Sequence, residues 1–575
     1  MLLQKLKEYY GTVPALPPMY QNMRVPWLID LDEKGNFNGV IRTSDETQPN
    51  GKRKKTKDRG KTYLTPDILR SGNAIRAKLI VDRGDYVLGL PRKEGDEERA
   101  KKCHQDFVEK VQQCYVDTGE PSLGAVINFL NSIKNLPADQ IKEKLSLSED
   151  FNPADVMSFQ VNGTLPFQQD TVKEWWAQNA LEEDEGREQM QCIVCGEQKT
   201  PERRLQVKIK GVPGGQTSGM AIISANENVF ESYGLKESLI APICRECAEA
   251  THNAVNALLK DQTTSIKVGS MAYIFWTKQK TKFSAASFLS DPDPEDVKSL
   301  IESAWKGKKA ALDVVDINEF YAAAFSPSGG RLAVREWLDT TVGKAKENLA
   351  RYFILQQITG LYGEEPSPIK LYALAAATER DAGDINARTT QTLIGNALKG
   401  EPFPDWLLYK AIQRNRAEQS ITRPRAALIK MALLSKQKYQ VKEDYMVKLE
   451  TENKSPAYLC GRLFAVLEDI QRAAIPGAGS TITDKYFGTA SSAPASVFGN
   501  LLRTAQHHLG KLRKEKEGAY YGLNKRLEEV LGELTEFPKT LSLEEQGYFS
   551  LGYYHQRAHD RAERTSKGKP KEEAS

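Results

Sequence analysis

Two close cysteine pairs, Cys192/Cys195 and Cys244/Cys247, are the residues of this chain best suited to bind a metal. Two residues between paired cysteines let both thiolates reach one ion, and four thiolates complete a closed tetrahedral zinc site. Gly196 directly follows the first pair, where the tight turn of a zinc knuckle suits glycine. The spacing predicts one structural Zn²⁺ with no open position for catalysis. The alternative is four unconnected thiols.

The sequence between the pairs, Lys208-Ile-Lys-Gly-Val-Pro-Gly-Gly-Gln-Thr-Ser-Gly219, is a basic, glycine-rich loop. Glycines let the backbone approach phosphates or bases closely, lysines supply positive charge, and a glutamine can read a base edge. No Lys-Ser/Thr follows the glycines, so the loop is not a nucleotide-hydrolysing P-loop. We expect the metal to hold the loop in place against DNA; a plain turn between strands is the alternative. The candidate DNA contacts are Lys208, Lys210, Gly214, Gly215, Gln216 and Ser218.

Further basic residues gather at two other places. Residues 51–61 hold seven cations and one acid, which would add sequence-independent affinity for nucleic acid or form a solvated surface loop. Asn73 follows at a turn and is a candidate polar reader of DNA. A C-terminal helix carries the other basic group, beside His507 and His508. The candidate contacts are Lys52, Arg53, Lys54 and Lys55 in the run, and Lys511, Arg513 and Lys514 in the helix.

Catalysis is difficult to build from these residues. The chain's six histidines form no His-Glu-x-x-His motif and no nuclease-type cluster with carboxylates. His252 is a second-choice zinc ligand, less suitable than Cys247. The sequence therefore predicts a non-catalytic nucleic-acid binder with a structural metal.

The composition is that of an ordinary folded protein with nearly balanced charge. Of 575 residues, 40% are hydrophobic and 27% are charged, and 80 basic against 76 acidic residues leave a net charge of +4. Any nucleic-acid site must therefore be local. No apolar run approaches the ~18 residues that a membrane helix needs. The first residues have no signal-peptide character, so we expect a cytoplasmic location.

The chain is long enough for two to four domains. Residue patterns predict an α+β N-terminal domain over residues 1–340 with a zinc-knuckle insertion at about 190–250, a helical connector over 341–440, and a C-terminal four-helix bundle over 441–575. The expected strands are 25–32, 37–42, 78–81, 86–90, 205–210, 219–224, 271–276, 319–325 and 331–337. The expected helices are 97–117, 121–147, 342–361, 369–380, 388–398, 404–419, 424–438, 456–474, 495–517, 521–535 and 542–561.

Several segments, taken in order along the chain, resemble one family. The stretch 208–226 and the following Phe230-Glu-Ser-Tyr-Gly234 closely resemble the large subunit of the type I-C CRISPR surveillance complex (Cascade). The opening residues 1–10, Tyr86-Val-Leu-Gly-Leu90, Phe325-Ser-Pro-Ser-Gly-Gly-Arg-Leu-Ala-Val-Arg335, and the late segments 537–547 and 551–556 resemble the same family. These segments span nearly the whole chain, which is therefore identified as a member of this family.

The resemblance implies a non-catalytic subunit that recognises the protospacer-adjacent motif (PAM) of double-stranded target DNA. It also implies roles in duplex unwinding, R-loop formation and recruitment of the helicase-nuclease. The implied partners are crRNA and the backbone, crRNA-capping and small subunits of Cascade, with no membrane. Related large subunits insert a glutamine wedge and a glycine loop at the PAM, for which Gly214-Gly215-Gln216 is the candidate here. The C-terminal helices resemble the small subunit, which an internal start at Met446 or Met431 would produce separately.

Two other functions stay open on the residues alone. A stand-alone zinc-dependent DNA-binding regulator would bind DNA specifically without crRNA. A metal-dependent nuclease would need carboxylate or histidine clusters that the sequence does not show.

Overall fold

The computed structural model describes residues 1–14, 16–44, 60–70, 74–180, 189–225, 227–306, 315–437 and 444–568. The chain divides into two compact units. Unit 1 comprises Met1, Leu3–Lys208 and Ile223–Ala254, and unit 2 comprises Leu2, Ile209–Ile222 and Val255–Ser575. Across the described ranges, every helix is too short or too polar to cross a bilayer.

Unit 1 is built on a sheet with the strand order β3-β2-β6-β5. Strand β2 (Trp27–Leu31) pairs antiparallel with β3 (Phe37–Arg42) and parallel with β6 (Val156–Val161). Strand β5 (Asp82–Arg83) completes the sheet, and β1 (Tyr20–Val25) pairs separately with β4 (Lys61–Pro66). The apolar faces of α3 (Glu97–Thr118) and α4 (Pro121–Ile133) supply Phe107, Val111, Phe129 and Leu130 to the core that this sheet shares.

Unit 2 begins with a sheet of order β12-β11-β10-β9. Strands β9 (Ser265–Val268), β10 (Met271–Thr277), β11 (Glu319–Ser328) and β12 (Arg331–Thr341) are antiparallel neighbours. Successive residues of β10 alternate between the two faces of the sheet, and Met271, Tyr273 and Phe275 belong to the main core of the unit. Helices α8 (Ala285–Ser290) and α9 (Pro294–Lys306) contribute to the same core.

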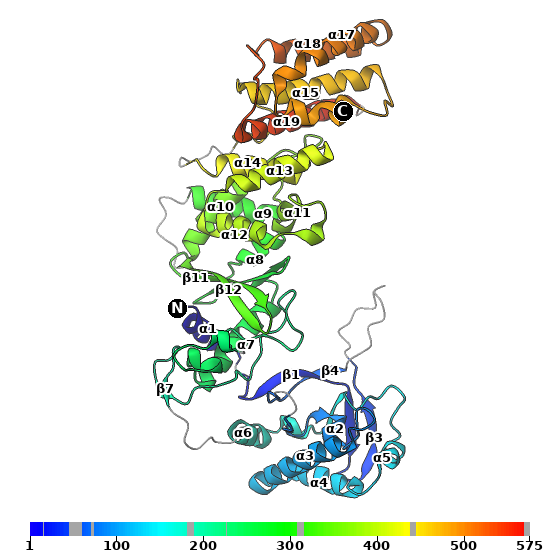
Figure 1. Cartoon of the computed structure of the whole chain (residues 1–575), viewed down its shortest axis with the longest axis vertical. Coiled ribbons are helices and arrows are strands. Elements are labelled where there is room, and N and C mark those ends of the chain that lie inside the picture. The colour runs from blue at the N-terminus through cyan, green and yellow to red at the C-terminus, as the bar shows by residue number, and fades with distance from the viewer. Residues whose placement is uncertain are drawn as a thin grey trace, which may run out of the picture. The chain divides into compact units, whose positions relative to one another are not determined.

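Helices fill the rest of unit 2 (Figure 1). The first group is α10 (Val342–Gln356), α11 (Leu371–Ala376), α12 (Ala387–Lys399), α13 (Asp405–Glu418) and α14 (Arg423–Leu434). The second group is α15 (Pro456–Ala474), α16 (Ile482–Ala490), α17 (Phe498–Glu515), α18 (Glu517–Leu531) and α19 (Leu543–Gly568). In the second group α15 packs against α16, α17, α18 and α19, and α19 also packs against α13 and α14. One hydrophobic core therefore joins the two groups.

The predicted class, a mixed α+β N-terminal region followed by a helical C-terminal half, is confirmed. The β2–β3 hairpin, strands β10 to β12, and the helices from α10 to α15 lie close to their expected positions. The domain boundaries near residues 340 and 440 stay predictions. Helix α16 was not predicted, because its nine residues are too few to show a clear period.

Four predicted strands are wrong. Residues 86–90 contain the end of the short helix α2 (Gly84–Val87), and 78–81 precede the two-residue strand β5. Their continuous apolar sequences are buried, and an apolar run of this length does not distinguish a strand from other buried segments. The segments 205–210 and 219–224 form only isolated bridges, one between Ile209 and Met220 and one between Ala221 and Arg331. The helix expected over 121–147 is interrupted before α5 (Ala138–Lys144), where Pro137 ends the helical pattern.

Helices α15 and α19 cross where each carries a glycine. A Cβ atom at Gly552 would collide with the carbonyl oxygen of Tyr458, and one at Gly461 would collide with that of Phe549. The two backbones approach too closely for any side chain at these positions. Gly510 on α17 has open space around it and is the matched control.

We expect Gly552→Ala to destabilise the protein by about 2 kcal/mol or more, because two helix backbones must separate. Gly510→Ala should stabilise it by about 0.5–1 kcal/mol through helix propensity. Urea unfolding of the full chain, followed by far-UV circular dichroism, measures both changes. Equal unfolding midpoints for the two variants would contradict the close crossing.

Candidate metal centre and nucleic-acid interface

The four sulfur atoms of Cys192, Cys195, Cys244 and Cys247 gather in one place in unit 1. They all lie within 4.8 Å of one another, and the Sγ atoms of Cys195 and Cys244 are 4.0 Å apart. In a tetrahedron with Zn–S bonds of about 2.3 Å, sulfur atoms stand about 3.8 Å apart. The four thiols therefore fit one metal ion of zinc's size and preference.

The first pair lies in a knuckle between two short strands, β7 (Met190–Gln191) and β8 (Gln198–Lys199). The N–H of Gly196 donates to the carbonyl of Cys192 at 2.9 Å, and the N–H of Cys192 donates to the carbonyl of Glu197 at 2.9 Å. Gly196 has a φ of +77°, which the turn requires and which glycine adopts without strain. The backbone thus points both thiols of the pair to the same side.

The second pair lies at the start of α7 (Arg245–Lys260). Pro201, just after β8, pairs with Cys244 in an isolated antiparallel β-bridge. This bridge joins the start of α7 to the segment that follows the first cysteine pair. The backbone N–H of Cys244 donates to the sulfur of Cys192 at 3.4 Å. Backbone N–H groups at a helix start stabilise a thiolate. Burial nevertheless raises the pKa of both Cys244 and Cys247, and the neighbouring Cys192 raises both further, so a bound cation is needed to hold them as thiolates.

Backbone N–H groups and one lysine partly offset the negative charge that thiolates bring to the site. Burial raises the pKa of the Cys192 thiol, but the backbone N–H groups of Cys244, Cys195 and Val194 outweigh burial and lower it to about 6. Burial lowers the pKa of Lys7, but its contact with the sulfur of Cys247 raises it above the usual value. Lys7 comes from the N-terminal helix α1 (Leu2–Tyr10), so a cation from α1 partly offsets the charge of the thiolates.

His252 is not a ligand in this arrangement. Its Nδ1 lies 2.6 Å from the carbonyl oxygen of Val207, and burial lowers its pKa to about 4. His252 is therefore a neutral core residue, and the choice of Cys247 as the fourth ligand is supported.

The glycine-rich loop is closed by its own backbone and belongs to unit 2. The N–H of Ile209 donates to the carbonyl of Met220, and the N–H of Met220 to the carbonyl of Ile209, both at 2.8 Å. Between them, Gly215 N–H donates to the Val212 carbonyl at 3.1 Å. Gly214 has a φ of +73° after Pro213, the residue order that a type II turn favours.

The loop lies against the tip of the β11–β12 hairpin. Ala221 pairs in parallel with Arg331, and its N–H donates to the carbonyl of Gly330 at 3.2 Å. A Cβ atom on Gly214 would stand 3.6 Å from Pro327, and one on Gly330 would stand 3.7 Å from Oε1 of Gln216. Two segments that each resemble the Cascade large subunit thus form one surface.

The hairpin tip is stiffened below its turn. Nε of Arg335 donates to Oγ of Ser326 across the strands at 2.6 Å. Farther along, the rings of Trp276, Tyr321 and Trp337 pack together, with centroids 5.4 to 5.7 Å apart. The tip is therefore a rigid support for the loop. We name the surface formed by residues 210–219 and 327–331 the loop–tip surface.

The predicted contact residues of the loop differ in placement. Lys210, Gly214, Gln216 and Ser218 are exposed on the loop–tip surface. Gly215 is instead packed, since a Cβ atom there would clash with the Met220 side chain. Lys208 belongs to unit 1, where it lines a pocket with Arg204 and Lys236.

The expectation that the metal holds this loop is not supported by its contacts. The cysteines belong to unit 1, whereas the loop's closing hydrogen bonds and its pairing with β12 lie within unit 2. The loop lies between the two cysteine pairs in the sequence, which suggested that the metal holds it. Backbone pairing of Ile209 with Met220 closes the loop, and pairing of Ala221 with Arg331 attaches it to β12.

The remaining predicted contacts are spread over the chain. Lys511, Arg513 and Lys514 are exposed on α17, where Lys511 lies 3.9 Å from Glu515 and the Arg513 guanidinium lies over Tyr520. Lys52, Arg53, Lys54, Lys55 and Asn73 lie outside the described residues.

Sequence reasoning missed the hairpin tip and Lys267. Lys267 is exposed on β9, and its Nζ would stand 3.7 Å from a Cβ atom on Gly211. The signal for the tip was present in Ser326-Pro-Ser-Gly-Gly-Arg331, a turn sequence rich in small residues that ends in a cation. Nothing local indicated Lys267, because its proximity to the loop arises from the tertiary fold.

We expect the purified chain to contain one zinc ion, and Cys247→Ser to lose it. Three remaining thiolates hold zinc far more weakly, and the knuckle loses folding energy with the metal. Elemental analysis together with chelator-induced zinc release measures this directly. Cys460→Ser removes a buried thiol outside the cluster and should keep one zinc per chain. A wild-type chain without zinc, purified from zinc-supplemented medium, would contradict the assignment.

The model of a family of CRISPR-associated proteins, Cas_Csd1, matches residues 4–560 of the chain. No curated protein matches the chain. The matched range contains both cysteine pairs, the glycine-rich loop and the hairpin tip. The chain therefore belongs to the Cas_Csd1 family of CRISPR-associated proteins.

Proposed function

We propose that the chain is the non-catalytic large subunit of a type I-C Cascade complex and contacts the PAM of double-stranded DNA through the loop–tip surface. In RNA-guided recognition, base pairing reads the target sequence, and protein reads only a short motif beside it. The family match and the segments quoted above support membership in such a complex. The observation that carries the DNA-contact role is the placement of Gln216 over Gly330 on a rigid hairpin tip.

The loop–tip surface has the features that a wedge needs. Its exposed residues are small or polar, so the backbone can enter a groove, and Lys210 and Lys267 supply positive charge beside it. Because the RNA–DNA hybrid is about as stable as the duplex that it replaces, a few contacts can decide whether strands open. Unwinding and R-loop formation are proposed to start at this surface.

A non-catalytic role is supported by the chemistry of the described residues. In the ranges that the structure describes, the four cysteines are the group of metal-binding side chains found together, and they form a closed set. Burial lowers the pKa of the buried His555 to about 3 and also lowers the pKa of the partly buried His104, so both histidines are neutral. We propose that DNA is degraded by a recruited helicase-nuclease, as the resemblance to the Cascade large subunit implies. Cleavage of DNA by the chain with Mg²⁺ or Mn²⁺ would overturn this assignment.

We further propose that α15, α17, α18 and α19 form a four-helix bundle equivalent to the small subunit. An internal start at Met446 leaves all of α15 to α19 intact, whereas a start at Met431 cuts α14 near its end. Met446 is thus the favoured start. Lys511, Arg513 and Lys514 on α17 are the proposed contacts to the displaced strand.

Gln216→Ala in the assembled crRNA complex should weaken binding of a PAM-containing duplex about tenfold, because one well-placed polar contact to a base is worth about 1–3 kcal/mol. Complex assembly should be unaffected, because the Gln216 side chain is exposed. Gel-shift titration with duplex targets measures the affinity, and Gln113→Ala on α3 is the control. Unchanged affinity would remove the wedge role from the loop–tip surface.

Replacing Lys52, Arg53, Lys54 and Lys55 together by alanine should flatten the salt dependence of duplex binding. The slope of log K against log salt should fall in magnitude by about 0.9 for each cation that contacts a phosphate. Binding is measured between 50 and 200 mM salt, with the exposed pair Lys101→Ala and Lys102→Ala as control. An unaltered slope would show that the run does not contact DNA.

A further inference from the structure

Tyr233 is held at the tip of a tight turn with its ring in solvent. The N–H of Leu235 donates to the carbonyl of Ser232 at 2.9 Å, and these two residues pair as an antiparallel bridge. Tyr233 has a φ of +54° and Gly234 a φ of +73°. The Tyr233 side chain is 99% exposed. An aromatic ring therefore stands entirely in water, at a backbone conformation that favours glycine over tyrosine.

Folding does not explain this residue. A non-glycine residue in the left-handed region costs free energy, on the order of 1 kcal/mol, and Tyr233 recovers none of it by burial. Four residues away, Glu237 also has a positive φ, of +54°, and Val229 before the turn is 82% exposed. Backbone strain and exposed apolar side chains thus occur together in one short segment of unit 1. Strain of this kind is typical of binding sites.

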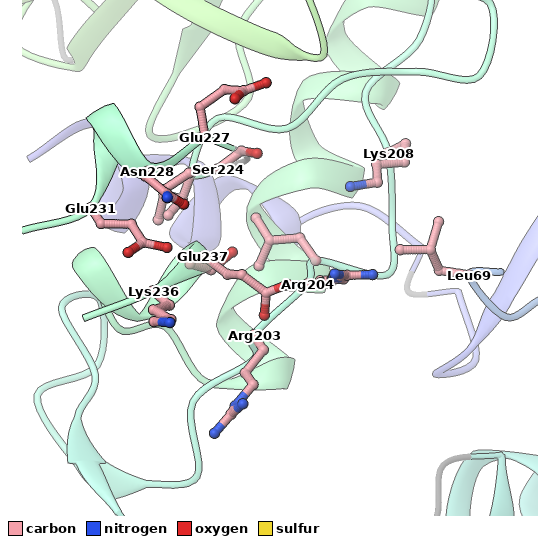
Figure 2. Close-up of a pocket in the computed structure, with 14 residues that line it drawn as sticks. Leu69, Arg203, Arg204, Lys208, Ser224, Glu227, Asn228, Glu231, Lys236 and Glu237 are labelled. Carbon is pink, nitrogen blue, oxygen red and sulfur yellow. Dashed lines mark hydrogen bonds and ion pairs between the residues drawn. The ribbon is translucent and has the colours of Figure 1, made fainter. Parts of the chain in front are cut away.

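The turn rises from the rim of a pocket of about 580 Å³ within unit 1 (Figure 2). Glu231 and Lys236, on either side of the turn, both line it. In Figure 2 the Lys208 amino group and the Glu231 carboxylate point toward each other from opposite sides of the pocket. The charged lining residues are Arg203, Arg204, Lys208, Lys236, Glu227, Glu231 and Glu237.

The pocket presents both signs of charge in fixed positions. Nε of Arg204 donates to Oε1 of Glu237 at 2.6 Å, which orients the guanidinium. Burial lowers the pKa of Lys208, and electrostatic repulsion by the nearby Arg204 guanidinium lowers it further. An anion between them would relieve that repulsion. Glu231 and Asn228 add groups that can accept hydrogen bonds from an amino group.

We propose that this turn and pocket bind one unstacked nucleotide of a single-stranded nucleic acid. The base stacks on Tyr233, its amino edge faces Glu231 and Asn228, and its phosphate lies between Lys208 and Arg204. Exposed aromatic rings beside cations are the common basis of single-strand binding. A docked protein segment is less compatible, since the residues that flank the ring on the pocket rim are charged and not apolar.

This inference does not depend on the proposed contact with duplex DNA. The loop–tip surface lies in unit 2 and is tested with PAM duplexes, whereas the Tyr233 turn lies in unit 1 and needs no duplex. Either proposal can therefore fail while the other holds.

The test uses the full-length chain and fluorescein-labelled 20-mers of deoxycytidine and of cytidine, read by fluorescence anisotropy. Tyr233→Gly should weaken binding at least about fivefold, the lower end of what one stacked base contributes. The same variant should melt at an equal or higher temperature, because glycine removes the backbone strain. Tyr233→Phe should bind like the wild type. Tyr372→Ala, which removes a 52% exposed ring on α11, should leave binding unchanged.

The two oligonucleotides distinguish the source of the nucleotide. A loss confined to the DNA arm identifies a displaced strand, and a loss confined to the RNA arm identifies crRNA. Wild-type affinity of Tyr233→Gly for both oligonucleotides would overturn the proposal. If that variant also failed to assemble with the other Cascade subunits, Tyr233 would belong to a protein interface instead.

Discussion

The arrangement of the proposed DNA-contact surface depends on two reciprocal hydrogen bonds between Ile209 and Met220. They close the glycine-rich segment into a loop, and Ala221 continues directly into pairing with Arg331 on β12. Without this pairing, a segment with four glycines would lose much conformational entropy on contact with a ligand. Closure during folding reduces that cost at the binding step, which is the basis of preorganisation. Pro327 and Gly330 of the hairpin tip lie against one side of the loop and restrict its movement on that side.

The four-cysteine cluster has a different structural role, in unit 1. The segments on either side of the first cysteine pair have little regular structure: β7 and β8 are two residues each. A closed Cys₄ site replaces the missing hydrophobic core of such a region. Lys7 brings α1 to the thiolates, and Gln4 of the same helix donates to the Val194 carbonyl at 3.4 Å. A metal ion bound by the four cysteines would therefore organise unit 1 locally, while backbone pairing organises the loop.

The parts that the sequence predicts are those whose signal is local. Cysteine spacing predicts the Cys₄ cluster, and residue periodicity predicts α3, α15 and strands β10 to β12 within a few residues. The parts that it misses arise from contacts distant in sequence. The loop and the hairpin tip are more than 100 residues apart, and no period links Gln216 to Gly330. Tyr233 lies in a segment that resembles the family, but the sequence shows neither its positive φ nor its exposure.

A net charge of +4 on 575 residues fits the proposed role better than a strongly basic chain would. Non-specific affinity for DNA comes almost entirely from cations on phosphates, and a genome offers on the order of 10⁶–10⁹ competing sites. A subunit that must find a short motif gains little from uniform positive charge. It needs a small, rigid contact surface with few cations, because strand exchange is nearly balanced and small contributions decide it. The loop–tip surface, with Lys210 and Lys267 beside small residues, has that composition, whereas broad attraction would hold the complex on sequences without a target.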